Sequence, residues 1–480
     1  MTTAVGAAVP QRPDVDGSSV PAGEHTPRRP AGWPGRLRDA LFPEAPNTPV
    51  TPRRILVTAA LVSFGVIYSL GRVRGPGAGA LDTVWAEDGA NFLHDAANMS
   101  AYDAFTTPLN GYYHFFPRLL AEITTRLPVS SWAAANATLA ALSTVGLALI
   151  VYAASGAHLR HPVLRLLVAA PVVAQWASNG EIVDNVATLQ FPALYALFWV
   201  LLAVQVRPVG KIAAPVFALV VAFSTTLALT LLPLALLRAV VRRDRSGILM
   251  AVAMAFGVSV QLWTYVSGEA EREIVGMVPN YDPLWNLQQF AEIQVPVTYL
   301  GEAWMRGKVV HTTEHNALIL LAWGILLAAV ALAVWRRSRP AWLLAAVAGL
   351  HAVGIFALQI ALRGGVPGRY LLPSLLLLVT MTVALLIPRS WTGGTSWRGP
   401  EGFGNVPIVV LATLLTVVAI ANYRHDHIWR TTTVPSWSKQ VTANTAACEA
   451  DPALQAVRFR TGPANKRMWG WFDIPCSRLR

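Results

Sequence analysis

The chain has 480 residues, of which 54% are hydrophobic and only 13% are charged. This composition is typical of an integral membrane protein and excludes an ordinary soluble domain. The net charge of +12 could suggest nucleic acid as a partner. However, the arginines lie at the ends of apolar blocks rather than together on one polar face, so we interpret them as topology determinants and expect no nucleic-acid partner.

The first 54 residues are rich in Pro, Gly, Ser, Thr and Arg and contain no apolar run. This pattern predicts a disordered tail over residues 1–54. No signal peptide precedes the first apolar block, which begins near Ile55, so the tail is expected to stay in the cytoplasm.

Apolar blocks recur through residues 55–422, each about long enough to cross a hydrocarbon core of ~30 Å as a helix. They predict an all-α polytopic membrane protein with about 11 transmembrane helices. The predicted helices are 55–74, 131–154, 161–178, 189–206, 211–225, 228–241, 246–266, 315–335, 340–362, 369–388 and 405–422.

Basic residues sit at every second turn between these helices, which places those turns in the cytoplasm by the positive-inside rule. The outer side then receives all the long polar segments, together with two short turns. These outer segments are 75–130, 179–188, 267–314, 363–368 and the tail 423–480.

The stretch 211–241 decides whether the number of membrane crossings is odd or even, because it is apolar yet has basic residues at both ends. Two short helices that turn near Ser224-Thr225-Thr226 satisfy the rule at both ends. One long tilted helix is the alternative, and it would put the carboxyl tail in the cytoplasm.

The first outer loop contains two adjacent carboxylates, Glu87 and Asp88, followed by two amphipathic helical patterns. These patterns predict interfacial helices in the first extracytoplasmic loop. The first has Phe92, Leu93, Ala96 and Ala97 on its apolar face. The second begins at Pro117. Its apolar residues are Phe116, Leu119, Leu120 and Ile123, and its polar residues are Arg118, Glu122 and Arg126.

A carboxylate at the mouth of a membrane cavity can accept the proton of an attacking hydroxyl. Glu87 and Asp88 are therefore the candidate catalytic residues. The alternative is that Asp88 caps the amphipathic helix, as Asp often does at a helix start.

Three further clusters lie on the predicted outer side. Tyr113, His114 and Arg118 are suited to hydroxyls and phosphates, although aromatic belts and snorkelling arginines look similar. Glu181 and Asp184 form a second acidic site or else a solvated turn. Arginine is disfavoured at the outer start of a helix, so Arg369, followed by Tyr370, suggests a contact to a lipid phosphate.

The loop 267–314 carries many charged residues among aromatic ones and could form a lid. The two cysteines, Cys448 and Cys476, both lie in the carboxyl-terminal segment. Export of that segment would favour a disulfide between them, and two free thiols are the alternative. No Walker loop, dinucleotide fingerprint or zinc-type histidine pair is present, so nucleotide-dependent chemistry is not expected.

These features resemble the C-type glycosyltransferase superfamily (GT-C), membrane enzymes that use polyprenyl-phosphate-linked sugars. The resemblance rests on the acidic pair with its following amphipathic helix, on the short-helix hairpin with Thr225-Thr226 at its turn, and on Arg369-Tyr370-Leu371-Leu372-Pro373. It covers roughly residues 55–390. The family more often has Asp-Glu where this chain has Glu-Asp.

The resemblance implies a bacterial plasma-membrane glycosyltransferase with the amino terminus in the cytoplasm and the carboxyl terminus outside. Glu87 or Asp88 would activate the acceptor hydroxyl, and Arg369 would contact the donor phosphate. The expected partners are a polyprenyl-phosphate-linked sugar, a glycan or lipid acceptor and membrane lipids. Some members bind a divalent cation, so Mg²⁺ or Mn²⁺ remains open as a cofactor.

Two other functions compete with this one. A flippase or secondary transporter for a lipid-linked or polysaccharide substrate would use Arg369 and the outer carboxylates only to bind a headgroup. An assembly subunit would use Glu87 and Asp88 for stability alone. High Ala, Leu, Arg and Val usage suggests a GC-rich, actinobacteria-like source and hence cell-envelope or cell-wall biogenesis.

Overall fold

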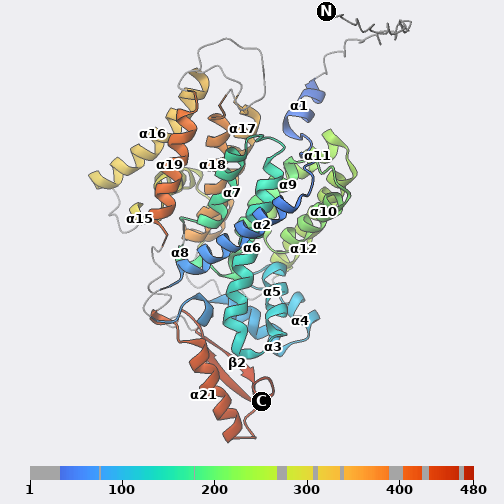
Figure 1. Ribbon diagram of the computed structural model, residues 1–480, viewed down its shortest axis with the longest axis vertical. Helices are drawn as coiled ribbons and strands as arrows, with labels where there is room; N and C mark the ends of the chain where they lie inside the picture. Colours follow the sequence, from blue (N-terminus) through green and yellow to red (C-terminus); the bar gives the residue numbers. More distant parts are fainter. Residues whose placement is uncertain are drawn as a thin grey trace, which may run out of the picture.

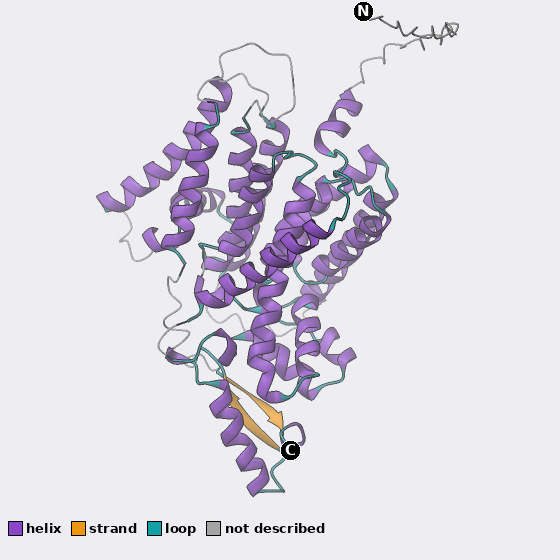
Figure 2. Cartoon of the chain, in the orientation of Figure 1, coloured by secondary structure: helices purple, strands orange, loops and turns teal. Residues whose placement is uncertain are grey.

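The computed structural model describes residues 33–74, 77–177, 179–267, 278–305, 312–335, 340–388, 404–423, 432–463 and 470–480. These residues form a bundle of helices with one two-stranded antiparallel sheet near the carboxyl end (Figures 1 and 2). Among them, six helical segments are long and apolar enough to span a membrane, and four more are apolar but shorter. The chain is therefore a multi-pass helical membrane protein.

The six longer segments are α2 (Pro52–Arg72), α6 (Trp132–Ser155) with its preceding turn, α12 (Arg245–Ser267), α16 (Thr313–Trp335), α17 (Trp342–Arg363) and α18 (Leu371–Leu385) with its preceding turn. The shorter helices are α7 (Pro162–Ala174), α9 (Gln190–Leu202), α10 (Pro208–Ala222) and α19 (Val406–Ala421). Proline in the first turn begins α2, α7, α10 and α19, where its missing N–H is not needed.

The stretch 211–241, which decides whether the number of membrane crossings is odd or even, contains two helices, α10 and α11 (Leu232–Arg242). Between them lies a 3₁₀ turn, η5 (Thr226–Leu231), whose first N–H groups are capped by Thr225. The hydroxyl of Ser224 accepts a hydrogen bond of 2.9 Å from the backbone N–H of Phe116. The turn of this hairpin therefore touches the first outer loop, as the two-helix alternative requires.

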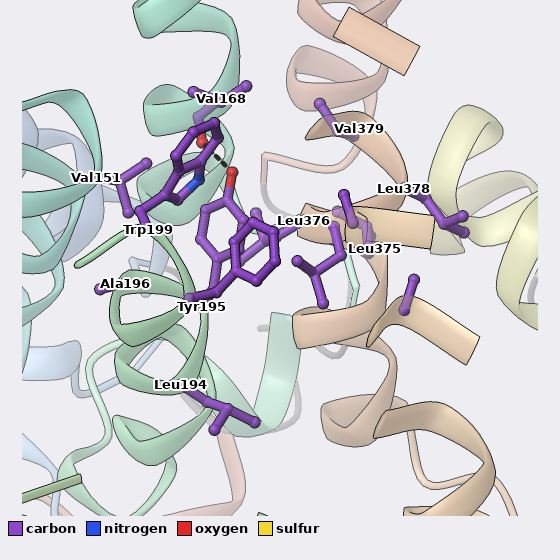
Figure 3. Close-up of a cluster of buried hydrophobic side chains, with 14 of the residues drawn as sticks. Val151, Val168, Leu194, Tyr195, Ala196, Trp199, Leu375, Leu376, Leu378 and Val379 are labelled. Atoms are coloured by element: carbon purple, nitrogen blue, oxygen red, sulfur yellow. Dashed lines mark hydrogen bonds between the residues drawn. The ribbon is translucent and has the colours of Figure 1, made fainter. Parts of the chain in front are cut away.

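The core is centred on α9 and α18, in which nearly every side chain is buried because both helices are apolar all round. Tyr195 is one of the few residues of α9 with a polar group. Its hydroxyl donates to the carbonyl of Val168 at 3.0 Å and lies 2.7 Å from the hydroxyl of Thr380 (Figure 3). The buried phenol is thus satisfied and joins three helices.

The predicted disordered tail is wrong for residues 33–54. Helix α1 (Trp33–Leu41) leads into Leu41 and Phe42, which are buried in the main core. Beyond them, Glu44 forms a β-bridge with Val204, and its carboxylate forms an ion pair with Arg242 at 2.9 Å. The few apolar anchors of this region were hidden by its proline-rich and charged composition. Residues 1–32 lie outside the described residues.

The prediction of a polar outer loop over 267–314 is wrong for residues 283–300. Helix α13 (Pro283–Gln289), the π-helical η6 (Phe290–Gln294) and α14 (Val295–Leu300) follow one another, and α14 is buried. The amide of Gln294 donates to the carbonyl of Leu371 at 3.3 Å, and the hydroxyl of Tyr299 lies 2.6 Å from that of Thr382. Polar side chains with such buried partners make a core segment look like a surface loop in the sequence. The charged residues Glu269, Glu271, Arg272, Glu273, Arg306, Lys308 and His311 lie outside the described residues.

At the end of the bundle remote from α1, the first outer loop and the carboxyl-terminal segment pack together (Figure 1). The loop contains η2 (Asp88–Leu93, a π-helix), α3 (His94–Asn98), α4 (Ala101–Thr106) and α5 (Phe115–Thr125). The carboxyl-terminal segment contains α21 (Trp437–Ala450), β1 (Ala456–Arg460) and β2 (Trp471–Pro475), and a disulfide joins Cys448 to Cys476. Strand β1 pairs with β2 so that Phe459 lies opposite Phe472.

The apolar face predicted to lie in the membrane interface instead packs against protein. Phe92 and Leu93 are fully buried in one cluster with Trp437, Phe459 and Phe472. In α5 the predicted faces hold only in part. Leu120 is buried and Arg126 is exposed as predicted, but Arg118 is buried whereas Leu119 and Ile123 are exposed. The reason is that Arg118 finds a buried carboxylate, Asp95, at 2.8 Å.

Candidate active site

The acidic pair lies on a tight turn at the start of η2. Ala86, the residue before the pair, has a φ of +44°, and Asp88 is only 1% exposed. One oxygen of Asp88 accepts the N–H of Ala187 at 2.9 Å. The other accepts the side-chain amide of Asn136 at 2.7 Å and the N–H of Val186 at 3.0 Å.

Asp88 therefore does cap a helix, although not the one that follows it. The element is η4 (Val186–Thr188), where the carboxylate shares the capping with Asn185, whose side-chain oxygen also accepts the N–H of Ala187 at 2.9 Å. Both oxygens are engaged by N–H donors, so this carboxylate fixes the first loop to the 179–188 turn.

Glu87 is half-buried on the same turn and lies close enough to Arg369 for electrostatic interaction. Arg369 itself forms a 3.0 Å ion pair with Glu181. It belongs to the 3₁₀ turn η7 (Gly368–Tyr370) that begins α18. Three segments that are far apart in the sequence thus bring two carboxylates to one arginine.

Tyr370 lies between two guanidinium groups. The guanidinium carbon of Arg369 is 5.4 Å from the centre of its ring and that of Arg363 is 5.6 Å away. Both distances are within the range of cation–π attraction. Arg363 was not among the predicted site residues, although its position at the same predicted outer turn as Arg369 was a signal available in the sequence.

The aromatic cluster of the first loop approaches the same arginines. The rings of Tyr112 and His114 stack with centres 4.1 Å apart, and Gln190 donates to the Tyr112 hydroxyl at 3.3 Å. Burial raises the pKa of Tyr112 to about 12, an increase that the charges of Arg363 and Arg369 oppose. Burial, helped by the charge of Arg118, lowers the pKa of His114 to about 3, so this imidazole is neutral.

Tyr113 and Arg118 are held by other partners. The backbone N–H of Tyr113 donates to the amide oxygen of Gln261 at 2.8 Å, and its carbonyl accepts from the same side chain at 3.1 Å. The guanidinium of Arg118 is paired with Asp95 and lies 5.5 Å from the ring centre of Phe92. Both residues fasten the first loop, whereas Tyr112, their neighbour in the predicted cluster, is close enough to Arg363 and Arg369 for electrostatic interaction. Gln190, which contacts the Tyr112 hydroxyl, was not predicted.

The two members of the predicted second acidic site diverge. Glu181 pairs with Arg369, but Asp184 is buried and accepts a 2.7 Å hydrogen bond from Ser69 near the end of α2. Asp184 has a φ of +52°, so the turn reverses sharply between the two carboxylates. Within the described ranges, no three His, Cys, Asp or Glu side chains are placed to hold a metal ion, so no ligand set for Mg²⁺ or Mn²⁺ is identified.

Known proteins give little further guidance. No protein-family model matches the chain, and no curated sequence does either. Among solved structures, the chain is similar to the crystal structure of ArnT from Cupriavidus metallidurans bound to undecaprenyl phosphate, at 14% identity and a TM-score of 0.36. The match covers 84% of this chain and 80% of ArnT. A similarity of this size does not establish a common activity.

Proposed function

We propose that this chain is an integral membrane glycosyltransferase. It would move a sugar from a polyprenyl-phosphate-linked donor to a cell-envelope glycan or lipid acceptor on the outer face of a bacterial plasma membrane. The supporting observation is the cluster of Glu87, Glu181, Arg363 and Arg369 at the end of the bundle that carries the first outer loop. Carboxylates beside arginines are costly next to a membrane unless they are used.

In the proposed reaction the donor phosphate lies at Arg369 and Arg363, which flank Tyr370. The Glu181 carboxylate holds Arg369 in place before the donor arrives. Guanidinium groups suit a phosphate because they can donate two parallel N–H bonds to it. They also neutralise the negative charge that grows on the leaving phosphate.

The acceptor hydroxyl then attacks the anomeric carbon from the face opposite the phosphate. The new carbon–oxygen bond forms as the bond to the phosphate breaks, the anomeric centre inverts, and polyprenyl phosphate leaves. The hydroxyl proton passes to a carboxylate that acts as general base. The enzyme contributes position, proton removal and charge neutralisation, without a covalent intermediate.

We assign the base to Glu87 and an anchoring role to Asp88. Asp88 accepts three N–H bonds and is buried, so a proton on either oxygen would displace a backbone or amide donor. Glu87 is half-buried and faces the arginine cluster.

The test compares Glu87→Gln with Asp88→Asn in purified protein. The assay measures transfer of radiolabelled sugar from decaprenyl- or undecaprenyl-phosphate donors to membrane glycan extracts, with thermal melting as the control. We expect Glu87→Gln to lose transfer by about 10²-fold or more with an unchanged melting temperature. Asp88→Asn should lower the melting temperature because an amide nitrogen would face N–H donors.

Full activity of Glu87→Gln would reject this residue as the base. Absence of transfer by the wild-type protein with every donor would reject the enzyme and favour a flippase, a transporter or an assembly subunit.

A further inference from the structure

The carboxyl-terminal segment makes backbone contact with the residues that lead into Glu87. Gly462 and Trp85 form a parallel β-bridge. The N–H of Ala86 donates to the carbonyl of Gly462, and the N–H of Gly462 donates to the carbonyl of Val84 at 3.3 Å. These hydrogen bonds flank Trp85, and one of them is made by Ala86, the residue directly before the proposed base, although the two segments are far apart in the sequence.

At this contact neither Gly462 in the carboxyl-terminal segment nor Gly89 in the first loop has room for a Cβ atom. A Cβ on Gly462 would lie 2.3 Å from Cγ2 of Val434 and 2.5 Å from Cζ3 of Trp85. A Cβ on Gly89, on the other side of the acidic pair, would lie 2.5 Å from Cγ2 of Thr461. The turn and the carboxyl-terminal segment are therefore packed directly against each other.

The turn needs such support because Ala86 adopts a left-handed conformation, with a φ of +44°. A side chain makes this conformation unfavourable, and it persists only where surrounding contacts hold it. Gly462 holds Ala86 on one side of Glu87, and the N–H groups of Val186 and Ala187 hold Asp88 on the other. The orientation of Glu87 is fixed by both.

Further contacts place the whole segment over this turn. The carboxylate of Asp82 accepts the hydroxyl of Ser436 at 2.6 Å and the N–H of Ser438 at 2.7 Å, at the start of α21. The indole of Trp437 donates to the carbonyl of Val129 at 2.8 Å, and Asn98 donates to the carbonyl of Asp473 at 3.1 Å.

We infer that the disulfide-closed carboxyl-terminal segment, residues 432–463 and 470–480, is a positioning element of the active site, and that Gly462 holds the Ala86–Asp88 turn in the shape that presents Glu87. The inference rests on the proposed function, since it takes Glu87 as the base. Gly462 acts through the turn and does not touch the reacting atoms.

The test uses Gly462→Ala in the full-length chain, with Gly324→Ala as a matched control, because a Cβ on Gly324 would meet nothing within 4 Å. Hydrogen exchange of the peptide spanning 83–90 reports the turn independently of activity. In Gly462→Ala we expect exchange there to be faster by about tenfold, with exchange in α9 and α18 unchanged. We expect kcat to fall by about tenfold or more while the donor KM changes by less than about twofold.

A second variant, Gly462→Ala with Val434→Ala, removes the nearest colliding methyl group and keeps the test valid if the single variant does not fold. Wild-type exchange at 83–90 in both Gly462 variants would overturn the inference, as would a loosened turn with unchanged kcat. If the wild-type protein transfers no sugar, the proposed function fails, and the exchange measurement alone still decides whether Gly462 holds the turn.

Discussion

Arg118 shows how far a single partner can change the position of a charged side chain. Its charge predicts the solvated face of α5, yet it is 2% exposed because Asp95 lies 2.8 Å away. On the same helix, Arg126 pairs with Glu122 at 3.6 Å and remains 77% exposed. Glu122 and Asp95 are similarly buried, at 12% and 11% exposed, so the two pairs compare a buried with an exposed arginine.

We expect Asp95→Ala to lower the free energy of unfolding by about 3–5 kcal/mol, because it leaves the guanidinium of Arg118 buried without its carboxylate. Glu122→Ala should change it by no more than about 1 kcal/mol, because solvent already screens Arg126. Denaturant unfolding followed by tryptophan fluorescence measures both. Equal losses in the two variants would contradict this account.

His114 predicts a pH dependence of stability. Burial lowers its pKa in the folded protein to about 3, whereas the unfolded chain takes up a proton near pH 6.5. Between these values the unfolded state binds more protons, so the contribution of His114 is full above pH 6.5 and falls as the pH is lowered.

We therefore expect His114→Phe, which keeps a ring against Tyr112, to be less sensitive to acid than the wild-type protein. Below pH 6.5 the difference in the free energy of unfolding should change by up to ~1.4 kcal/mol per pH unit. Melting curves from pH 8.5 to pH 5 test this. A difference that also varies between pH 7.5 and 8.5 would assign the effect to another group.

At the scale of elements, the carboxyl-terminal segment is small, and it is stabilised by two kinds of contact. Its own core consists of Trp437, Phe459 and Phe472, and the disulfide between Cys448 and Cys476 closes it. A unit of this size rarely folds on its own apolar core, so the disulfide and the contacts with the first loop are both needed.

We expect the double variant Cys448→Ser, Cys476→Ser to destabilise this segment by about 2–5 kcal/mol. Proteolysis within 432–480 should become faster, while the transmembrane bundle keeps its melting transition. Limited proteolysis followed by mass spectrometry distinguishes the two regions. Unchanged cleavage within the segment would show that its contacts with the loop are sufficient.

Helix positions could be predicted because their signals are local. Each of the eleven predicted segments matches a helix within a few residues, and arginine or proline marks many of the ends. The burial of α14 could not be predicted, since it depends on Gln294 reaching a carbonyl 77 residues away. Likewise the burial of Arg118 in α5 depends on Asp95, 23 residues before it.

The candidate site was predictable only in part for the same reason. Arg369 was recognisable because arginine is disfavoured at the outer start of a helix. The anchoring role of Asp88 was not, because its partners are backbone N–H groups of Val186 and Ala187, about a hundred positions away. Every residue except proline has a backbone N–H, so the amino-acid sequence does not reveal which of these groups will be donors to Asp88.

At the scale of the whole molecule, different segments of the chain lie at the two ends of the bundle. Helix α1 lies toward one end, and the first outer loop with the carboxyl-terminal segment lies at the other (Figure 1). The proposed topology puts the first end in the cytoplasm and the second outside. The described cysteines are both in the disulfide, so introduced cysteines can be labelled against a low background.

We expect Tyr102→Cys, at a position that is 76% exposed in α4, to react with a membrane-impermeant maleimide on intact cells. Val50→Cys, at a position that is 68% exposed before α2, should react only after the membrane is opened. Labelling of Val50→Cys on intact cells, or protection of Tyr102→Cys, would contradict the topology.

The contact between the first loop and the carboxyl-terminal segment also imposes an order on biosynthesis. Asp82 leaves the ribosome 354 residues before Ser436, its partner at the start of α21. During that interval every membrane helix after α2 is made and inserted, but the turn that carries Glu87 lacks the segment that covers it. A nascent chain, or one truncated after α19, would therefore have its spans in place and remain inert. Under the proposed function and topology, activity would begin only when the last part of the chain has been exported and its cysteines oxidised, so completion of the chain would itself activate the enzyme.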